Sequence, residues 1–253
     1  MTKIKHTLQD AAALYREGRL EEAGAICAAL LRITPGDFDA RHLQGLIAFQ
    51  AKDFQRAADV IGAALEITPH PLAYNNRGAA LLELKQTAQA LECFDKALAL
   101  KPDFVSALNN RGNALRALRR TAEAVTAYDA ALSRRPDYAE AWYNRGLALD
   151  EMKDHAEAIK SYRQAIAFKP DYADAWSNRG VALANVGRWA EALQCYERAI
   201  AADPEHACAH WNMSLCFLQL GDFKRGWAGH EWRWKVANLS LEPRTFPRPL
   251  WLG

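Results

Sequence analysis

A proline recurs at a nearly constant interval through most of this chain. Successive members of the set lie 34, 33, 34, 34 and 34 residues apart, and they are Pro35, Pro69, Pro102, Pro136, Pro170 and Pro204. Each proline follows one apolar run of helical period and precedes another, which is where proline can end one helix and begin the next. A constant interval of this length predicts an array of repeated units that bury their apolar faces against one another.

Small residues recur in register with the prolines. Position 8 of the successive units is Ala11, Gly45, Gly78, Gly112, Gly146, Gly180 and Ser214, and position 20 is alanine in the first six. Small residues let two antiparallel helices approach closely, and larger apolar residues at positions 4, 11, 24 and 28 fill the remaining space. Each unit is therefore predicted to be a pair of helices joined by a short polar turn.

The segment 141–170, AWYNRGLALDEMKDHAEAIKSYRQAIAFKP, resembles the tetratricopeptide repeat. It has that family's Trp, Gly, Ala, Tyr, Ala and Pro at the expected spacings. The resemblance covers about residues 4 to 240 and implies an all-α fold: a right-handed α-α superhelix, or solenoid, of about seven helix-turn-helix repeats plus a C-terminal capping helix. The repeats are expected near 4–37, 38–70, 71–104, 105–138, 139–172, 173–206 and 207–240, which together form an array over 1–240. Residues 241–253 are expected to be a proline- and aromatic-rich tail, or a linker to a further domain.

Charge and motifs exclude several classes of function. The net charge is +2 with both signs interspersed, so there is no electrostatic basis for a nucleic-acid or membrane partner. No apolar run approaches transmembrane length, and the five cysteines are scattered, which together favour a cytoplasmic location. No phosphate-binding loop, nucleophile elbow or zinc-protease motif is present, so we expect neither catalysis by these residues nor a cofactor. We also expect no metal site, because a helical Cys208 would point away from His206 and His210.

Asparagine recurs at position 6 of the first helix. The series is Asn76, Asn110, Asn144, Asn178 and Asn212. The resemblance implies that this helix faces a concave groove. Stacked helices lie about 8–10 Å apart and extended peptide advances about 3.3 Å per residue, so one asparagine matches about every third residue of a bound strand. A primary amide both donates and accepts, and can hold a peptide unit without reading its side chain. The series is similar to the asparagine ladder of eukaryotic O-linked N-acetylglucosamine transferase.

Neighbouring positions would complete a peptide-binding groove. Positions 5, 9, 12 and 13 contribute Asn75, Asn109, Asn113, Tyr143, Trp211, Arg116, Asp150, Glu151 and Asn185. This mixture of polar and aromatic side chains suits an extended polypeptide better than a lipid. Two alternatives stay open: asparagine is tolerated on a solvated helix face, or it was inherited by duplication of one ancestral repeat. Against the first, asparagine is a mediocre helix former, and five of them reduce helix propensity five times.

Arginine at position 7 predicts a different role. It occurs in four repeats, and in each of them an acidic residue stands 26 residues later; in the other three repeats both are absent. We expect one structural ion pair per repeat, and the pairs are Arg77–Asp103, Arg111–Asp137, Arg145–Asp171 and Arg179–Glu205. The alternative is that these guanidinium groups point into the groove.

The C-terminal segment from residue 221 is rich in tryptophan. Trp227 and Trp234 lie seven residues apart and would share one helix face, where they could cap the last repeat. The segment also resembles the junction at which bacterial repeat arrays lead into a heptosyltransferase-like glycosyltransferase domain. Three hypotheses therefore stand: a non-catalytic scaffold that binds extended polypeptide, the substrate-selecting N-terminal region of a glycosyltransferase that continues beyond residue 253, and a module that forms homo-oligomers through its terminal repeats.

Overall fold

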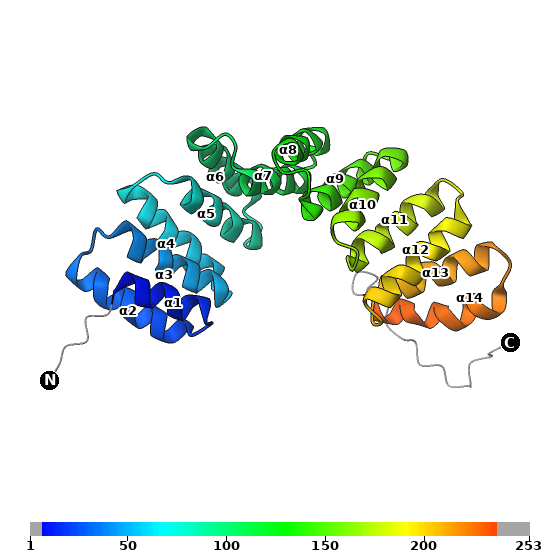
Figure 1. Cartoon of the computed structure of the whole chain (residues 1–253), viewed down its shortest axis with the longest axis horizontal. Helices are drawn as coiled ribbons and strands as arrows, with labels where there is room; N and C mark the ends of the chain where they lie inside the picture. The colour runs from blue at the N-terminus through cyan, green and yellow to red at the C-terminus, as the bar shows by residue number, and fades with distance from the viewer. Residues whose placement is uncertain (1–6, 237–253) are drawn as a thin grey trace. The chain divides into compact units, whose positions relative to one another are not determined.

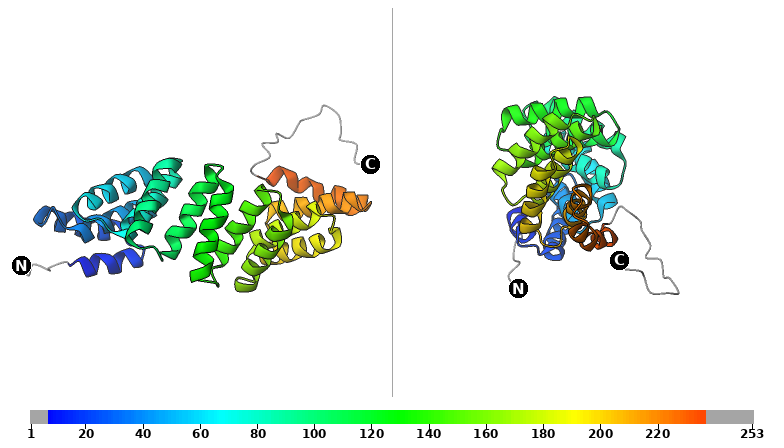
Figure 2. Two further views of the ribbon diagram at one scale, coloured as in Figure 1. Left: turned by 90° about the horizontal axis from the view of Figure 1, so that it is seen from above. Right: turned by 90° about the vertical axis from the view of Figure 1, so that its right-hand side faces the viewer.

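The computed structural model describes residues 7–236. Within them the chain forms fourteen α-helices and one short 3₁₀ helix, with no strand (Figure 1). The helices fall into two units: the N-terminal unit ends at Pro136 and contains α1–α8, and the C-terminal unit begins at Asp137 and contains α9–α14 and η1. In each unit consecutive helices lie side by side (Figure 2). This confirms the predicted all-α fold of stacked helix pairs.

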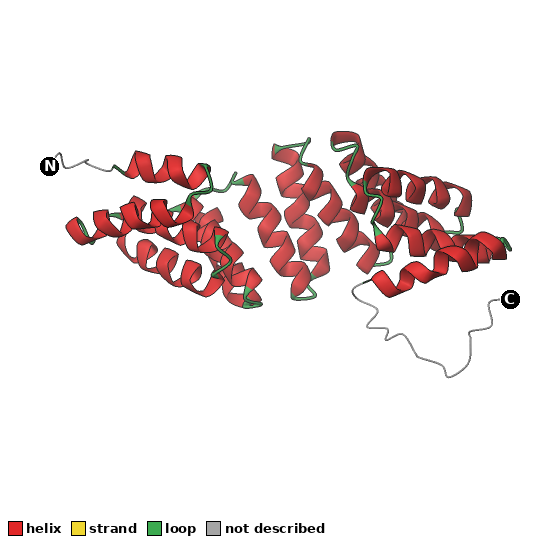
Figure 3. Cartoon of the chain, turned by 90° about the horizontal axis from the view of Figure 1, so that it is seen from below, coloured by secondary structure: helices red, strands yellow, loops and turns green. Residues whose placement is uncertain are grey.

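The helix boundaries repeat as regularly as the sequence does. The first helices of the pairs are α1 (Leu8–Arg16), α3 (Phe38–Gln50), α5 (Pro71–Glu83), α7 (Val105–Ala117), α9 (Ala139–Glu151), α11 (Ala173–Asn185) and α13 (Ala207–Gln219). The second helices are α2 (Leu20–Ile33), α4 (Phe54–Ile67), α6 (Thr87–Leu100), α8 (Thr121–Arg134), α10 (His155–Phe168), α12 (Trp189–Ala202) and α14 (Phe223–His230). Short loops join them (Figure 3). No described helix is both long and apolar enough to cross a membrane.

The two helices of a pair are in tight contact at the glycine of position 8. A Cβ added to Gly146 would lie 2.5 Å from Cε1 of Tyr162, and one added to Gly112 would lie 2.4 Å from Cε1 of Tyr128. Both tyrosine side chains are completely buried. A larger residue at position 8 would therefore force the pair apart, which explains the recurrence of glycine there.

The turn inside each pair has a left-handed residue at position 15. It is Gly18, Lys52, Lys85, Arg119, Lys153, Gly187 or Gly221, with φ between 61° and 81°. Such a residue just after a helix lets backbone N–H groups return to the last free carbonyl oxygens, and glycine adopts that conformation most easily. Four repeats place a long basic residue there instead.

The first helices are the more closely spaced set. In the N-terminal unit α3 contacts α1 and α5, and α5 contacts α7; in the C-terminal unit α11 contacts α9 and α13. Among the described elements no two second helices contact each other in this way. Each unit therefore curves toward its first helices, whose exposed side chains line its inner face.

The end of the array differs from the expectation that Trp227 and Trp234 share one face of a helix. α14 has only eight residues, and the chain continues as the 3₁₀ helix η1 (Glu231–Lys235). A 3₁₀ helix has three residues per turn, so the seven-residue spacing no longer places Trp227 and Trp234 on one face. Instead the Trp232 ring stacks on His210 of α13, with ring centroids 3.8 Å apart. Trp227 is 61% exposed. The proline-rich tail 241–253 lies outside the described residues.

The first repeat begins at a cap. Thr7, which stands where the family pattern has Trp, accepts a hydrogen bond from the Asp10 backbone N–H, while the Asp10 carboxylate accepts from the Thr7 backbone N–H. This reciprocal arrangement satisfies donors at the helix start. Thr7 therefore begins α1 instead of packing against a neighbour.

Candidate functional site

The five asparagines of position 6 all belong to first helices and are all half-buried. Asn76 and Asn110 lie in α5 and α7 of the N-terminal unit. Asn144, Asn178 and Asn212 lie in α9, α11 and α13 of the C-terminal unit. Each therefore occupies a helix that contributes to the inner face of its own unit.

Three of these amides are held by side chains at position 5 of the preceding repeat. Asn110 Nδ2 donates to Oδ1 of Asn75 at 3.0 Å, and Asn178 Nδ2 donates to the hydroxyl of Tyr143 at 3.0 Å. In the same register Asn76 Nδ2 lies 3.1 Å from Nε2 of His42. The asparagine series thus forms part of the contact between successive first helices.

His42 is a residue that the sequence reasoning missed. It is 8% exposed, and burial lowers the pKa of its imidazole, with a smaller contribution from His70. A neutral ring leaves one nitrogen as an acceptor, which suits the Asn76 amide donor. The sequence does contain a signal that could have identified His42. In each repeat that precedes a position-6 asparagine, position 5 is a side chain that can form a hydrogen bond.

Asn75 and Asn109 were expected to line the groove, but both are buried, with exposed fractions of 7% and 4%. Each also directs its own amide toward the next residue: Asn75 Nδ2 lies 3.4 Å from Oδ1 of Asn76, and Asn109 Nδ2 lies 3.5 Å from Oδ1 of Asn110. These buried position-5 amides therefore lie behind the position-6 amides and help to orient them.

Two other expected groove residues bond to the second helix of their own repeat. The buried Tyr128 hydroxyl donates to Oδ1 of Asn113 at 2.8 Å. The Tyr162 hydroxyl donates to Oδ2 of Asp150 at 2.9 Å, and Nδ1 of His155 lies 2.8 Å from Oδ1 of the same carboxylate. Because a buried hydroxyl needs a partner, Asn113 stabilises the contact between α7 and α8, and Asp150 stabilises the contact between α9 and α10.

A cavity of about 260 Å³ opens between α11, α12 and α13 of the C-terminal unit. Its lining residues are Val181, Ala184, Asn185, Trp189, Tyr196, Asn212, Leu215, Cys216 and Gln219. Two expected site residues, Asn185 and Asn212, thus share one concave surface with apolar side chains.

Two further expected site residues lie outside this cavity. Trp211 is half-buried, and its indole N–H has no hydrogen-bond partner among residues 7–236. Arg116 is half-buried in the last turn of α7.

The arginines of position 7 have other partners than those expected. Arg111 Nε lies 2.7 Å from Asp95 of α6 in the preceding repeat, and Arg145 Nη1 donates to Oγ of Ser161 in α10 at 2.8 Å. Within residues 7–236 no ion pair joins Arg77 to Asp103 or Arg179 to Glu205; Glu205 instead lies 3.1 Å from Lys235. The expectation of pairs with Asp103, Asp137, Asp171 and Glu205 is corrected accordingly. Arg77, Arg111 and Arg145 reach second helices, at Gly62, Asp95 and Ser161. The Arg179 guanidinium instead lies 5.7 Å from the ring centroid of Trp176 in its own helix.

His206 and His210 each have a structural partner. His206 Nδ1 accepts from the Ala209 backbone N–H at 3.1 Å, and its Nε2 lies 3.2 Å from Asp174. His210 Nε2 lies 2.9 Å from the carbonyl oxygen of Pro204, as Trp176 Nε1 lies 2.9 Å from that of Pro170. Position 4 thus anchors the preceding proline loop in both repeats.

Family comparisons agree with this architecture. Models described as tetratricopeptide repeat match residues 71–104, 109–173 and 173–206. The chain contains tetratricopeptide repeats. The matched residues include all four arginines of position 7, and they lie in both units.

Curated relatives share only a short part of the chain. The peroxisomal targeting signal receptor of Candida glabrata is 35% identical over 77 residues, which are 30% of this chain and 13% of that protein. The STIP1 homolog of Dictyostelium discoideum is 40% identical over 62 residues, which are 24% of this chain and 11% of that protein. The chain therefore matches about a tenth of the length of these relatives.

Solved structures show the fold. A tetratricopeptide repeat protein from Parabacteroides merdae has a TM-score of 0.72 at 18% identity, and the match covers 92% of this chain and 93% of that one. YrrB, described as a TPR protein with an unusual peptide-binding site, has a TM-score of 0.59 at 22% identity, over 72% of this chain and 95% of its own.

Proposed function

We propose that the chain is a non-catalytic scaffold that binds extended polypeptide on the inner face that the first helices form in each unit. The observation that carries the proposal is the fixed orientation of the position-6 amides: Asn110 is held by Asn75, and Asn178 by Tyr143. Holding a binding group in place before the ligand arrives lowers the entropic cost of binding.

The held amides keep hydrogen-bonding capacity. A primary amide has two N–H donors and an oxygen with two lone pairs. The bond from Asn178 to Tyr143 uses one donor, which leaves the other donor and the oxygen. One such group per repeat, at a helix spacing of about 8–10 Å, matches a peptide unit about every third residue of an extended strand. The remaining members of the proposed site are Asn76, Asn144 and Asn212, with Arg116, Trp211 and Asn185 around them. Asn109 is buried and supports Asn110.

The cavity beside Asn212 adds one element of side-chain selectivity. Val181 and Leu215 give it apolar walls, while Asn185, Asn212 and Gln219 supply polar groups. This combination is typical of a subsite for a peptide side chain. In the proposal, Asn212 holds the backbone while one aliphatic or aromatic side chain enters the cavity. The relatives named as targeting signal receptors, and the peptide-binding site reported for YrrB, agree with this class of partner.

A library of twelve-residue synthetic peptides, screened against the purified chain, would supply a probe whose affinity is then measured by fluorescence anisotropy. Changing Asn110, Asn144 and Asn178 together to alanine should weaken that peptide at least tenfold. The matched control changes the exposed amides Gln55, Gln89 and Gln194 of the second helices to alanine and should leave the affinity unchanged.

The same peptide provides a second, independent test. Because the asparagines are proposed to grip the backbone, N-methylation at every third residue should weaken binding far more than alanine replacement of most side chains. Equal binding by the triple variant, or indifference to N-methylation, would refute the role of the asparagine series.

The other sequence-based hypotheses stay predictions. The glycosyltransferase-like junction depends on the segment from residue 221 onward, of which residues 237–253 lie outside the described part of the chain. Sequence beyond residue 253 would decide that hypothesis. Self-association through terminal repeats predicts a molar mass that rises with concentration in light scattering.

A further inference from the structure

We infer that the N-terminal unit has a carboxylate-binding site on its second-helix side, between α4, α5 and α6, built around Arg77. This site is separate from the inner face and does not depend on the proposed peptide binding. The inference starts from a comparison of Arg77 with Arg111, which occupies the same position in the next repeat.

The partner of Arg111 identifies the carboxylate that Arg77 lacks. Arg111 in α7 pairs with Asp95 in the preceding second helix, at 2.7 Å. The residue of α4 that corresponds to Asp95 of α6 is Gly62, since both are the ninth residues of their helices. Arg77 therefore extends toward a helix position where the acid is missing.

The geometry places the guanidinium of Arg77 directly over this gap. A Cβ added to Gly62 would lie 3.1 Å from Cζ and 3.2 Å from Nη2 of Arg77. Nε of Arg77 is buried and has no hydrogen-bond partner among residues 7–236. A buried charged donor without an acceptor is costly, and a carboxylate is the group that a guanidinium fork binds most favourably.

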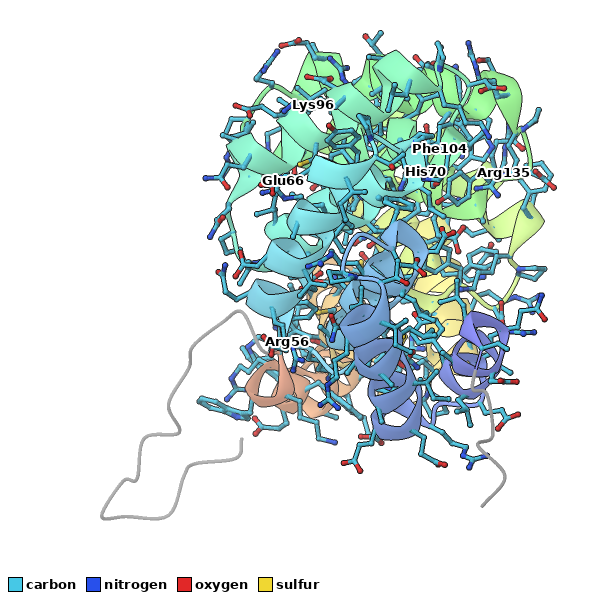
Figure 4. The ribbon with its side chains drawn as sticks, turned by 90° about the vertical axis from the view of Figure 1, so that its left-hand side faces the viewer. Arg56, Glu66, His70, Lys96, Phe104 and Arg135 are labelled. Carbon is cyan, nitrogen blue, oxygen red and sulfur yellow. The ribbon has the colours of Figure 1, made fainter. Side chains whose placement is uncertain are left out.

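A cavity of about 370 Å³ opens at the same place. It is lined by Asp59, Gly62, Ala63, Leu65, Glu66, Tyr74, Arg77 and Lys96. Lys96, whose Nζ lies 5.9 Å from the Tyr74 ring centroid, supplies a second positive charge. Glu66 and Lys96 lie at the same edge of the unit in Figure 4.

The acidic residues of the cavity limit what it can bind. Asp59 and Glu66 flank Gly62 on α4 and would repel a polyanion. The charges of Asp59, Glu66, Arg77 and Lys96 sum to zero. The site therefore selects a single carboxylate through direct contact with Arg77 and Lys96, and not through a net positive charge. Such a group could come from an aspartate or glutamate side chain of a partner protein or from a small carboxylic acid, because the chemistry recognised is the same.

The side-chain Nε–H signal of Arg77, followed by nuclear magnetic resonance at constant ionic strength, provides the test. Sodium acetate should shift it saturably, while the paired Arg111 in the same sample should not respond. Gly62→Asp should abolish the response, because it supplies the carboxylate in the way that Asp95 does. Asp95→Gly should make Arg111 responsive. Circular dichroism checks that both variants remain helical.

Two further probes identify the source of the carboxylate. If acetyl-Gly-Glu-Gly-amide binds at least tenfold more tightly than acetate, and its glutamine analogue does not bind, the ligand is a protein side chain. Acetate or glutarate binding as tightly as the peptide indicates a small acid. No saturable shift of Arg77 with any of these probes, or the same shift in Gly62→Asp, would overturn the inference.

Discussion

Asn110 donates a side-chain hydrogen bond of 3.0 Å to Asn75, a residue one repeat earlier in the sequence. The bond joins α7 to α5, and Asn75 itself is only 7% exposed. Asn110, which is proposed to contact the ligand, is therefore also part of the contact between successive first helices. A substitution that removes this hydrogen bond should therefore change both the stability of the fold and the affinity for the ligand.

Replacing Asn75 with alanine should lower the free energy of unfolding by about 1–2 kcal/mol, because the Asn110 amide loses a partner in a half-buried environment. Urea denaturation followed by circular dichroism would measure this. Asn75→His should retain at least half of the lost stability, since His42 holds Asn76 in the same register. An unchanged midpoint for Asn75→Ala would show that water replaces the bond without cost.

Gly146→Ala should destabilise the protein by about 2 kcal/mol. An added methyl group would lie 2.5 Å from Cε1 of the buried Tyr162, and overpacking of this kind outweighs the gain in helix propensity. Gly24→Ala is the matched control: nothing lies within 4 Å of that position, so it should stabilise α2 by about 0.5–1 kcal/mol.

The first repeat suggests the compensating change for Gly146→Ala. There Ala11 occupies position 8 and packs in the same core cluster as Cys27, which occupies position 24, the position of Tyr162 in its repeat. Combining Gly146→Ala with Tyr162→Cys should therefore cost less than the sum of the single changes. A double-mutant cycle with no coupling energy would contradict a direct contact.

Lys153→Gly should stabilise the C-terminal unit by about 0.5 kcal/mol. Lys153 has φ 66°, where a side chain is strained and glycine is not. Part of the gain is offset by the greater freedom of glycine in the unfolded chain. Thermal denaturation would measure the change. The converse replacement, Gly187→Lys, should lower stability by a similar amount because Gly187 has φ 77°.

His206 and Asp174 should make stability depend on pH. The hydrogen bond with Asp174 raises the pKa of His206 above 6.5, and the same bond lowers the pKa of Asp174 below 3.8. The histidine contribution is complete below pH 6.5 and is lost as the pH rises through the raised value; the aspartate contribution is lost as the pH falls below 3.8. The pair should therefore stabilise the protein most between about pH 4 and 6.5, by a few tenths of a kcal/mol because Asp174 is largely exposed.

Urea denaturation at pH 5.5 and pH 8 would test the pair. His206→Asn preserves a cap acceptor for α13 but removes the titrating group, so the stability difference between the two pH values should shrink. If that difference stays the same in His206→Asn, another group is responsible.

The sequence alone was sufficient for the helices and their pairing. The proline interval and the glycines of position 8 depend on local chain geometry and on contacts within one repeat. Because such contacts recur with the sequence period, the sequence alone predicts a close helix approach at Gly146, and Tyr162 fills the space there. The end of the array was less predictable, since the change from α14 to η1 depends on how Trp232 packs on His210.

The site was only partly predictable, for a physical reason that the arginines show well. Arg77, Arg111, Arg145 and Arg179 occupy one sequence position and covary with an acid, yet Arg111 reaches Asp95 and Arg145 reaches Ser161. A long side chain can contact several neighbours, and which one it meets depends on how the next helix is placed. The same holds for the asparagines, where only the packing of α5 against α7 shows that Asn75 supports Asn110. Sequence by itself determined which residues repeat and which helices pair, because these follow from short-range periodicity; the tertiary structure alone decided which polar groups bond to each other and which stay available, because that depends on distances between repeats.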